Sequence, residues 1–170
     1  GSISSRLTTG TQDYTTFTIT VASKASYDTG SYNAFYVNGV ERPVLTLIEG
    51  QTYRFDQSDS SNAGHPLRLA ADAAALTSAA SSSLTQYTNG VTAFGTPGTS
   101  GAYTEITVPI DSPSLYYYCT NHSNMGNLAA TFNSTVNVIG GNLFVPTGVS
   151  ATNSVGEETV SLVLAVAVSG

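Results

Sequence analysis

Short stretches of alternating apolar and polar residues run along most of this chain, separated by turns rich in Gly, Asn, Asp and Ser. Residues 17–21 alternate Phe, Thr, Ile, Thr and Val, which is the period of a half-buried strand. Residues 34–37 end in the pair Asn38-Gly39, which is typical of a tight hairpin turn. The same criteria predict strands at 44–48, 52–55, 66–69, 103–108, 114–119 and 128–138. We therefore expect an all-β sandwich with Greek-key connections.

Residues 70–101 break this pattern, because Ala, Ser, Thr and Gly replace most of the large apolar side chains. We expect a long loop there, with one short helix over residues 73–76 that Asp72 caps. Residues 96–101 combine Pro, Gly, Ser and Thr, which is typical of loop structure.

The pattern changes again at Gly140-Gly141. We divide the chain into an N-terminal arm at 1–13, a β domain at 14–139 and a C-terminal linker and β extension at 140–170. Thirty residues cannot build a core alone, so the apolar stretch 160–168 adds to the sandwich, pairs with another subunit or begins a repeat array. We favour pairing between subunits or a truncated array.

The amino-acid composition limits which kinds of molecule this protein is expected to bind. Only 9% of residues are charged, and 11 Asp and Glu against 5 Lys and Arg give a net charge of −6. This balance disfavours nucleic acid, since no basic stripe is available to neutralise phosphates. The longest apolar run, 162–168, is too short to span a membrane. No catalytic motif such as Gly-x-Ser-x-Gly is present, so we do not expect an enzyme.

The rarest side chains of the chain stand in a suggestive arrangement. There is one Cys, one Met and two His, and three of these four form the pattern Cys119-x-x-His122-x-x-Met125, with His65 upstream. Two imidazoles, one thiolate and one thioether are the ligands of a trigonal copper site with a long axial Met. The competing interpretation is a buried Cys that acts as a small hydrophobe, a core Met and two loop histidines. Each residue alone favours that interpretation, whereas the four together favour a metal site.

The residues around this pattern carry a family resemblance. The segment from Tyr116 to Gly126 resembles the C-terminal ligand loop of cupredoxins, the small blue-copper proteins, with a spacing similar to that of amicyanin and plastocyanin-like domains. Residues 44–55, followed by His65, resemble the strand–Gly–strand–His segment of that fold. The resemblance covers about residues 14–139. It implies a cupredoxin-like sandwich that binds one copper ion through His65, Cys119, His122 and Met125.

Two features depart from the family pattern. Cupredoxins usually follow the first His with Asn, whose N–H bonds the Cys sulfur, whereas Pro66 has no N–H to donate. We therefore expect Pro66 and Thr120, the neighbours of His65 and Cys119, to tune the site, and we expect a low reduction potential that Pro66→Asn would raise. The polar neighbours of His122 replace an apolar docking patch, which weakens a role as a diffusible electron carrier.

A second resemblance concerns context. Residues 94–103, the motif at 116–126 and the tail at 148–156 resemble modules of large structural proteins of marine bacteriophages, notably cyanophages, and of some marine bacteria. It implies a location in a virion or on an extracellular surface. We expect a non-enzymatic structural or surface-display module that binds copper and that self-associates, or contacts other subunits, through its C-terminal β segment. The alternatives are a blue-copper electron-transfer protein with a redox partner, and an adhesion module that contacts a host through residues 70–101.

Overall fold

The computed structural model describes residues 14–77 and 85–133, together with four two-residue strands beyond residue 137. The chain divides into two compact units, Gly1–Asn133 and Ser134–Gly170. The predicted arm at 1–13 lies outside the described residues. The predicted limits of the β domain at 14–139 stay a prediction.

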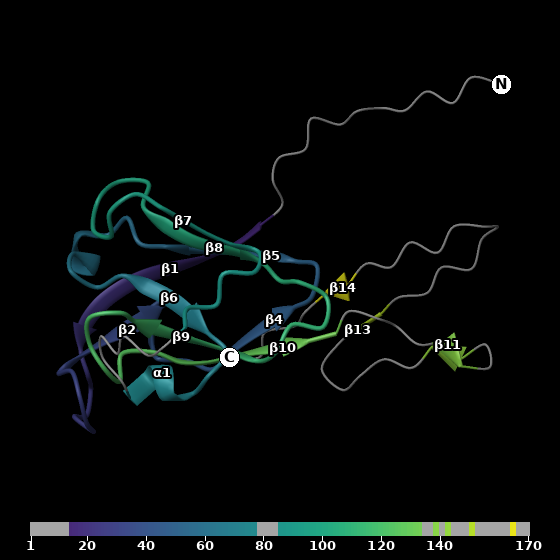
Figure 1. The fold of residues 1–170 in the computed structure, drawn as a ribbon, viewed down its shortest axis with the longest axis horizontal. Coiled ribbons are helices and arrows are strands. Elements are labelled where there is room, and N and C mark those ends of the chain that lie inside the picture. The colour runs from purple at the N-terminus through teal and green to yellow at the C-terminus, as the bar shows by residue number, and fades with distance from the viewer. Residues whose placement is uncertain are drawn as a thin grey trace, which may run out of the picture. The chain divides into compact units, whose positions relative to one another are not determined.

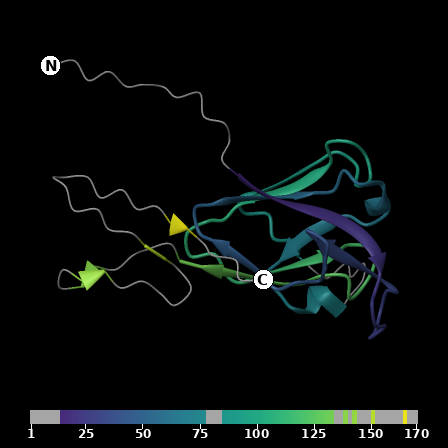
Figure 2. The same ribbon diagram turned by 180° about the vertical axis from the view of Figure 1, so that it is seen from behind.

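Two sheets face each other as layers in the first unit (Figures 1 and 2). The larger sheet has the order β3 (Val40–Glu41), β2 (Asn33–Val37), β1 (Tyr14–Ser23), β5 (Thr52–Asp56), β8 (Tyr103–Thr107) and β7 (Val91–Phe94). The smaller sheet has the order β4 (Leu45–Ile48), β10 (Asn127–Phe132), β9 (Leu115–Cys119) and β6 (Leu67–Ala70). The strand pairs are antiparallel except β1–β5 and β4–β10, which are parallel. The predicted all-β sandwich is confirmed, and the Greek-key connections stay a prediction.

Alternating side chains build the core between the two sheets. Strand β5 buries Tyr53 and Phe55 and turns Arg54 outward. Strand β9 buries Leu115, Tyr117 and Cys119 in the same way, and the rings of Phe55 and Tyr117 lie 6.4 Å apart across the core. The thiol of Cys119 is thus the last side chain of a row that points into the sandwich.

The region from residue 70 to residue 101 is partly regular. Helix α1 (Ala74–Thr77) begins one residue after the predicted start, and the carboxylate of Asp72 accepts a hydrogen bond of 2.8 Å from the N–H of Ala74. Strand β7, which the sequence pattern did not predict, pairs with β8 at the sheet edge. Residues 78–84 lie outside the described part.

The described residues of the second unit form two short antiparallel pairs. Strand β11 (Val138–Ile139) pairs with β12 (Asn142–Leu143), and β13 (Ser150–Ala151) pairs with β14 (Leu164–Ala165). Most of the stretch 160–168 is outside the described residues, so its pairing with another subunit stays a prediction. Among the described residues, no helix has the length and apolar character to cross a bilayer.

Candidate metal centre

Strand pairing brings distant parts of the chain to one end of the smaller sheet. Strand β6 runs antiparallel to β9 and places Leu67 opposite Cys119. His65 precedes Leu67 by two residues and therefore lies near the end of β9. His122 belongs to the β9–β10 loop (residues 120–126), which follows Cys119 directly.

The side chains of His65, Cys119 and His122 form one group. The Nδ1 atoms of His65 and His122 lie 3.8 Å and 3.6 Å from Sγ of Cys119, and the candidate ligand atoms of all three residues lie within 4.8 Å of one another. The two imidazole rings are 4.5 Å apart between centroids. Cys119 is buried, His65 is partly buried and His122 is exposed. The group could hold a metal ion.

These separations fit a single bound ion. Metal–sulfur bonds of about 2.3 Å and metal–nitrogen bonds of about 2.0–2.1 Å put sulfur and nitrogen about 3.5–3.8 Å apart in trigonal or tetrahedral geometry. The two Sγ–Nδ1 separations of 3.6 Å and 3.8 Å match this range. A buried sulfur flanked by two imidazoles is also the donor set that favours copper or zinc over hard cations. The residues present therefore fit a soft or borderline metal.

Met125 lies in the buried core cluster that also contains Cys119. Its carbonyl oxygen accepts a hydrogen bond of 2.8 Å from the N–H of Phe35, which ties the end of the β9–β10 loop to β2. This buried position of Met125 is compatible with a side chain that only packs in the core and with one that also binds the metal. The role of Met125 as a fourth ligand stays a prediction.

Burial shifts the pKa values of two residues of the group, Cys119 and His65. Burial raises the pKa of the Cys119 thiol, and the N–H groups of Asn121 and His122, which donate to the sulfur, oppose this rise. Burial, and then the nearby His122, lower the pKa of His65. Neutral imidazole is the form that binds a metal, whereas the thiol must lose its proton to do so.

The two sulfur hydrogen bonds bear on the expectation for Pro66. Residue 66 contributes no N–H, but the N–H groups of Asn121 and His122 supply the sulfur with donors from its own loop. The carbonyl of Pro66 accepts a hydrogen bond of 3.1 Å from the N–H of Thr120. Pro66 and Thr120 therefore join the two segments that carry His65 and Cys119, and their effect on a reduction potential stays a prediction.

Two buried amides, which the sequence analysis missed, hold the segment of His65. Gln57 donates a hydrogen bond of 2.9 Å to the carbonyl of His65 and accepts one of 3.0 Å from the N–H of Leu67. Asn62 accepts from Gln57 at 3.1 Å and donates to the carbonyl of Ile19 at 2.7 Å. Both residues stand in a polar stretch whose composition is typical of a solvated turn. The residues next to them in the sequence therefore do not indicate that they are buried.

Gly126 allows the β9–β10 loop to return to the sheet. A Cβ atom at this position would collide with the carbonyl group of Tyr117 on the neighbouring strand. Only a residue without a side chain permits this approach. The Gly that ends the Cys-x-x-His-x-x-Met-Gly pattern thus has a steric role.

No protein-family model, curated protein or solved structure matches this chain. The residues of the chain and their geometry establish a mostly β fold with two facing sheets, and a His–Cys–His group at one end of the smaller sheet.

Proposed function

We propose that this protein binds one copper ion through His65, Cys119 and His122, with Met125 as the axial ligand. The observation that carries the proposal is that two imidazole Nδ1 atoms face one buried sulfur at 3.8 Å and 3.6 Å. Thiolate and thioether ligands favour copper, whereas carboxylate-rich sites favour hard cations. Imidazole ligands also suit copper. Zinc is the competing metal, because it accepts the same thiolate and imidazole ligands.

The role that we propose for the metal is structural. A bound ion would link the segment before β6 to the end of β9 and the β9–β10 loop, although His65 and Cys119 are 54 residues apart in the chain. Since a metal that binds only the folded state adds its binding free energy to stability, copper would strengthen the sandwich at this end. We propose a non-enzymatic module of a virion or extracellular surface, in which the C-terminal β segment contacts other subunits.

Electron transfer is the second candidate, and the exposure of His122 favours it. The His122 ring is exposed while its Nδ1 atom lies 3.6 Å from the buried sulfur of Cys119. A copper ion in the group would therefore be shielded by protein on the sulfur side and reachable through one imidazole. That arrangement suits exchange of electrons with a redox partner.

Copper titration of the full chain tests the proposal. We expect one equivalent of Cu(II) to bind, to give an intense visible thiolate-to-copper band and to raise the unfolding free energy by about 2.7 kcal/mol at a free concentration one hundred times Kd. Cys119→Ser should abolish the band and most of the stabilisation. Reversible oxidation and reduction would favour electron transfer, and binding without reversible cycling would favour the structural role. A native protein that takes up no stoichiometric copper would overturn the proposal.

A further inference from the structure

We propose that Arg42, with its partners Lys24 and Asp28, is a positioning group for His122, and this inference rests on the proposed metal function. Arg42 and its partners hold the β9–β10 loop against the β1–β2 loop (residues 24–32). The exposed imidazole of His122 therefore stays beside the sulfur of Cys119. The distances and burial of four charged side chains support it.

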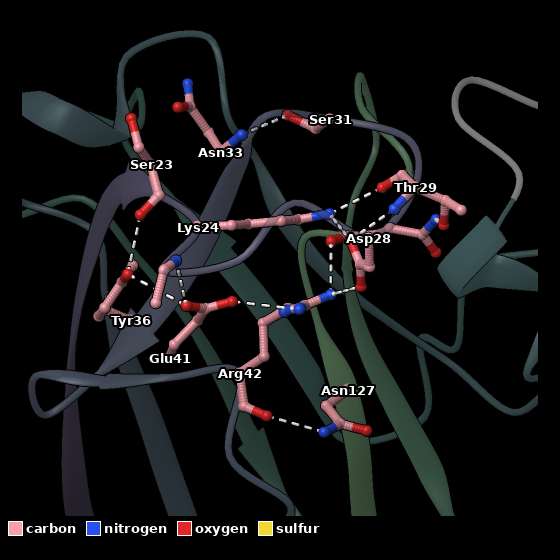
Figure 3. Close-up of polar contacts among 12 residues, drawn as sticks. Ser23, Lys24, Asp28, Thr29, Ser31, Asn33, Tyr36, Glu41, Arg42 and Asn127 are labelled. Carbon is pink, nitrogen blue, oxygen red and sulfur yellow. Dashed lines mark hydrogen bonds and ion pairs between the residues drawn. The ribbon is translucent and has the colours of Figure 1, made fainter.

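The four charges form a neutral network next to the β1–β2 loop (Figure 3). Lys24 forms an ion pair with Asp28 and donates a hydrogen bond of 2.7 Å to the carbonyl of Thr29, although only 1% of its side chain is exposed. Arg42 reaches Asp28 through Nη1 at 2.8 Å and Glu41 through Nη2 at 3.1 Å. The whole chain has only five Lys and Arg, so this network uses two of its few cations.

Arg42 extends the network to the β9–β10 loop. Its Nη1 atom also donates to the carbonyl of Asn124 at 3.3 Å, and its own carbonyl accepts from the side-chain amide of Asn127 at 2.7 Å. Arg42 thus contacts the chain on both sides of Met125 and Gly126. The bond to Asn124 depends on the guanidinium, whose several donors also hold Asp28 and Glu41.

The two loops also meet directly. The N–H of Ser31 donates to the carbonyl of Ser123 at 3.1 Å, and the side-chain amide of Asn124 donates to the hydroxyl of Thr29. Gly30 has a φ of +71°, and a Cβ there would lie 2.5 Å from Oγ of Ser123. The β1–β2 loop therefore approaches within van der Waals contact of the residue that follows His122.

These anchors decide where His122 lies. On its other side, the amide of Asn121 donates to the carbonyl of Gly64 at 2.9 Å, which ties the loop to the segment of His65. His122 is exposed, so protein contacts its ring on one side only, through Sγ of Cys119 and the ring of His65. The backbone that carries the imidazole is placed by bonds made by the residues on either side of it.

The backbone conformation of Arg42 also indicates that the contacts of its side chain stabilise this position. Its φ is +41°, in the left-handed region that favours Gly or Asn and costs other residues roughly 1–2 kcal/mol. The contacts of the guanidinium with Asp28, Glu41 and Asn124 offset that cost. An arginine placed there for solubility alone would have no such compensation.

Three variants test the inference with Cu(II) and Co(II) as probes. Arg42→Met should weaken metal binding by about tenfold, as loss of a group that supports a ligand typically does, and should shift the visible thiolate band. Arg42→Lys should give a smaller loss. Arg54→Met is the matched control, because Arg54 is equally exposed (22% against 21%) and pairs with Glu105 at 2.7 Å on the outer face of β5. It should keep wild-type affinity and spectrum.

Wild-type affinity and an unshifted band in Arg42→Met would overturn the inference while leaving the proposed function intact. If the wild-type chain binds neither metal, the proposed function fails, and the positioning role is judged on metal-free protein. The amides of Ser31 and Asn124, which donate to Ser123 and Leu76, should then exchange hydrogen at least about tenfold faster in Arg42→Met than in Arg54→Met. Equal protection would contradict the inference, and Arg42→Lys carries the same test if Arg42→Met does not fold.

Discussion

The two imidazoles of the candidate centre are held by opposite kinds of chemistry. The segment of His65 depends on two neutral amides, Gln57 and Asn62, which are 1% and 0% exposed. The loop of His122 depends on charged side chains, which range from 1% exposed at Lys24 to 46% exposed at Asp28. One half of the site is thus held by neutral amides in the core, and the other half is held by a charged network that reaches the surface.

This difference predicts different sensitivities. A buried amide that loses its partner leaves donors or acceptors without water, so each lost bond is costly and independent of salt. An exposed ion pair is screened by salt and contributes little by itself. The stability of the His65 half should therefore be sensitive to mutation but not to salt concentration. The stability of the His122 half should be sensitive to both.

Gln57→Leu should have the largest effect. The variant leaves the carbonyl of His65 and the N–H of Leu67 without their partner, which should lower the unfolding free energy of the metal-free protein by roughly 2–4 kcal/mol. Chemical denaturation measures the loss. The same change at the exposed Gln51 is the control and should stay within about 0.5 kcal/mol. A cost at Gln57 no larger than at Gln51 would show that the buried amide does not hold this segment.

Gly30→Ala should have an intermediate effect that isolates the contact between the loops. Gly30 and Gly39 share a positive φ, but a Cβ at Gly39 meets nothing within 4 Å, while one at Gly30 meets Ser123. Both Ala variants should lose about 1 kcal/mol for the backbone, and Gly30→Ala should lose roughly 1–2 kcal/mol more from overpacking. Only Gly30→Ala should also shift the visible band of bound copper. Equal losses would mean that the β1–β2 loop moves away at little cost.

Asp28→Asn should have the smallest effect, and one that depends on pH. Hydrogen bonds from Lys24 and then from Arg42 hold the pKa of Asp28 far below its usual value. The unfolded chain therefore binds the proton more readily, so this contribution to stability is present above about pH 4 and is lost as the pH falls below it. Chemical denaturation of wild type and Asp28→Asn should be measured from roughly pH 7 down to pH 2. The difference in unfolding free energy between the two proteins should shrink in acid. A difference that is constant with pH would contradict the ion-pair role.

Local pattern was enough to predict much of the fold and part of the site. Alternation located eight of the strands of the first unit, because side chains at every second position must face the core. Seven agree to within about three residues, whereas the strand predicted at 128–138 ends at Phe132. The spacing of Cys119 and His122 predicted their meeting, since one short loop carries both. The scarcity of Cys, Met and His then pointed to His65 as the partner. Strand β7 was missed because small residues surround it and its own side chains remain largely exposed.

The polar residues that support that site could be identified only once the distant parts of the chain were in place. Gln57 and Asp59 stand in the same polar stretch, yet Gln57 is buried, whereas Asp59 is exposed and accepts a hydrogen bond from the N–H of Ser61. Arg42 and Asn124 are 82 residues apart, and nothing near either residue indicates their contact. Most strands and the set of candidate ligands could be predicted from the residues alone, because alternation, spacing and composition do not depend on the fold. The tertiary structure decided burial and charge pairing, because these depend on which distant strands and loops come together.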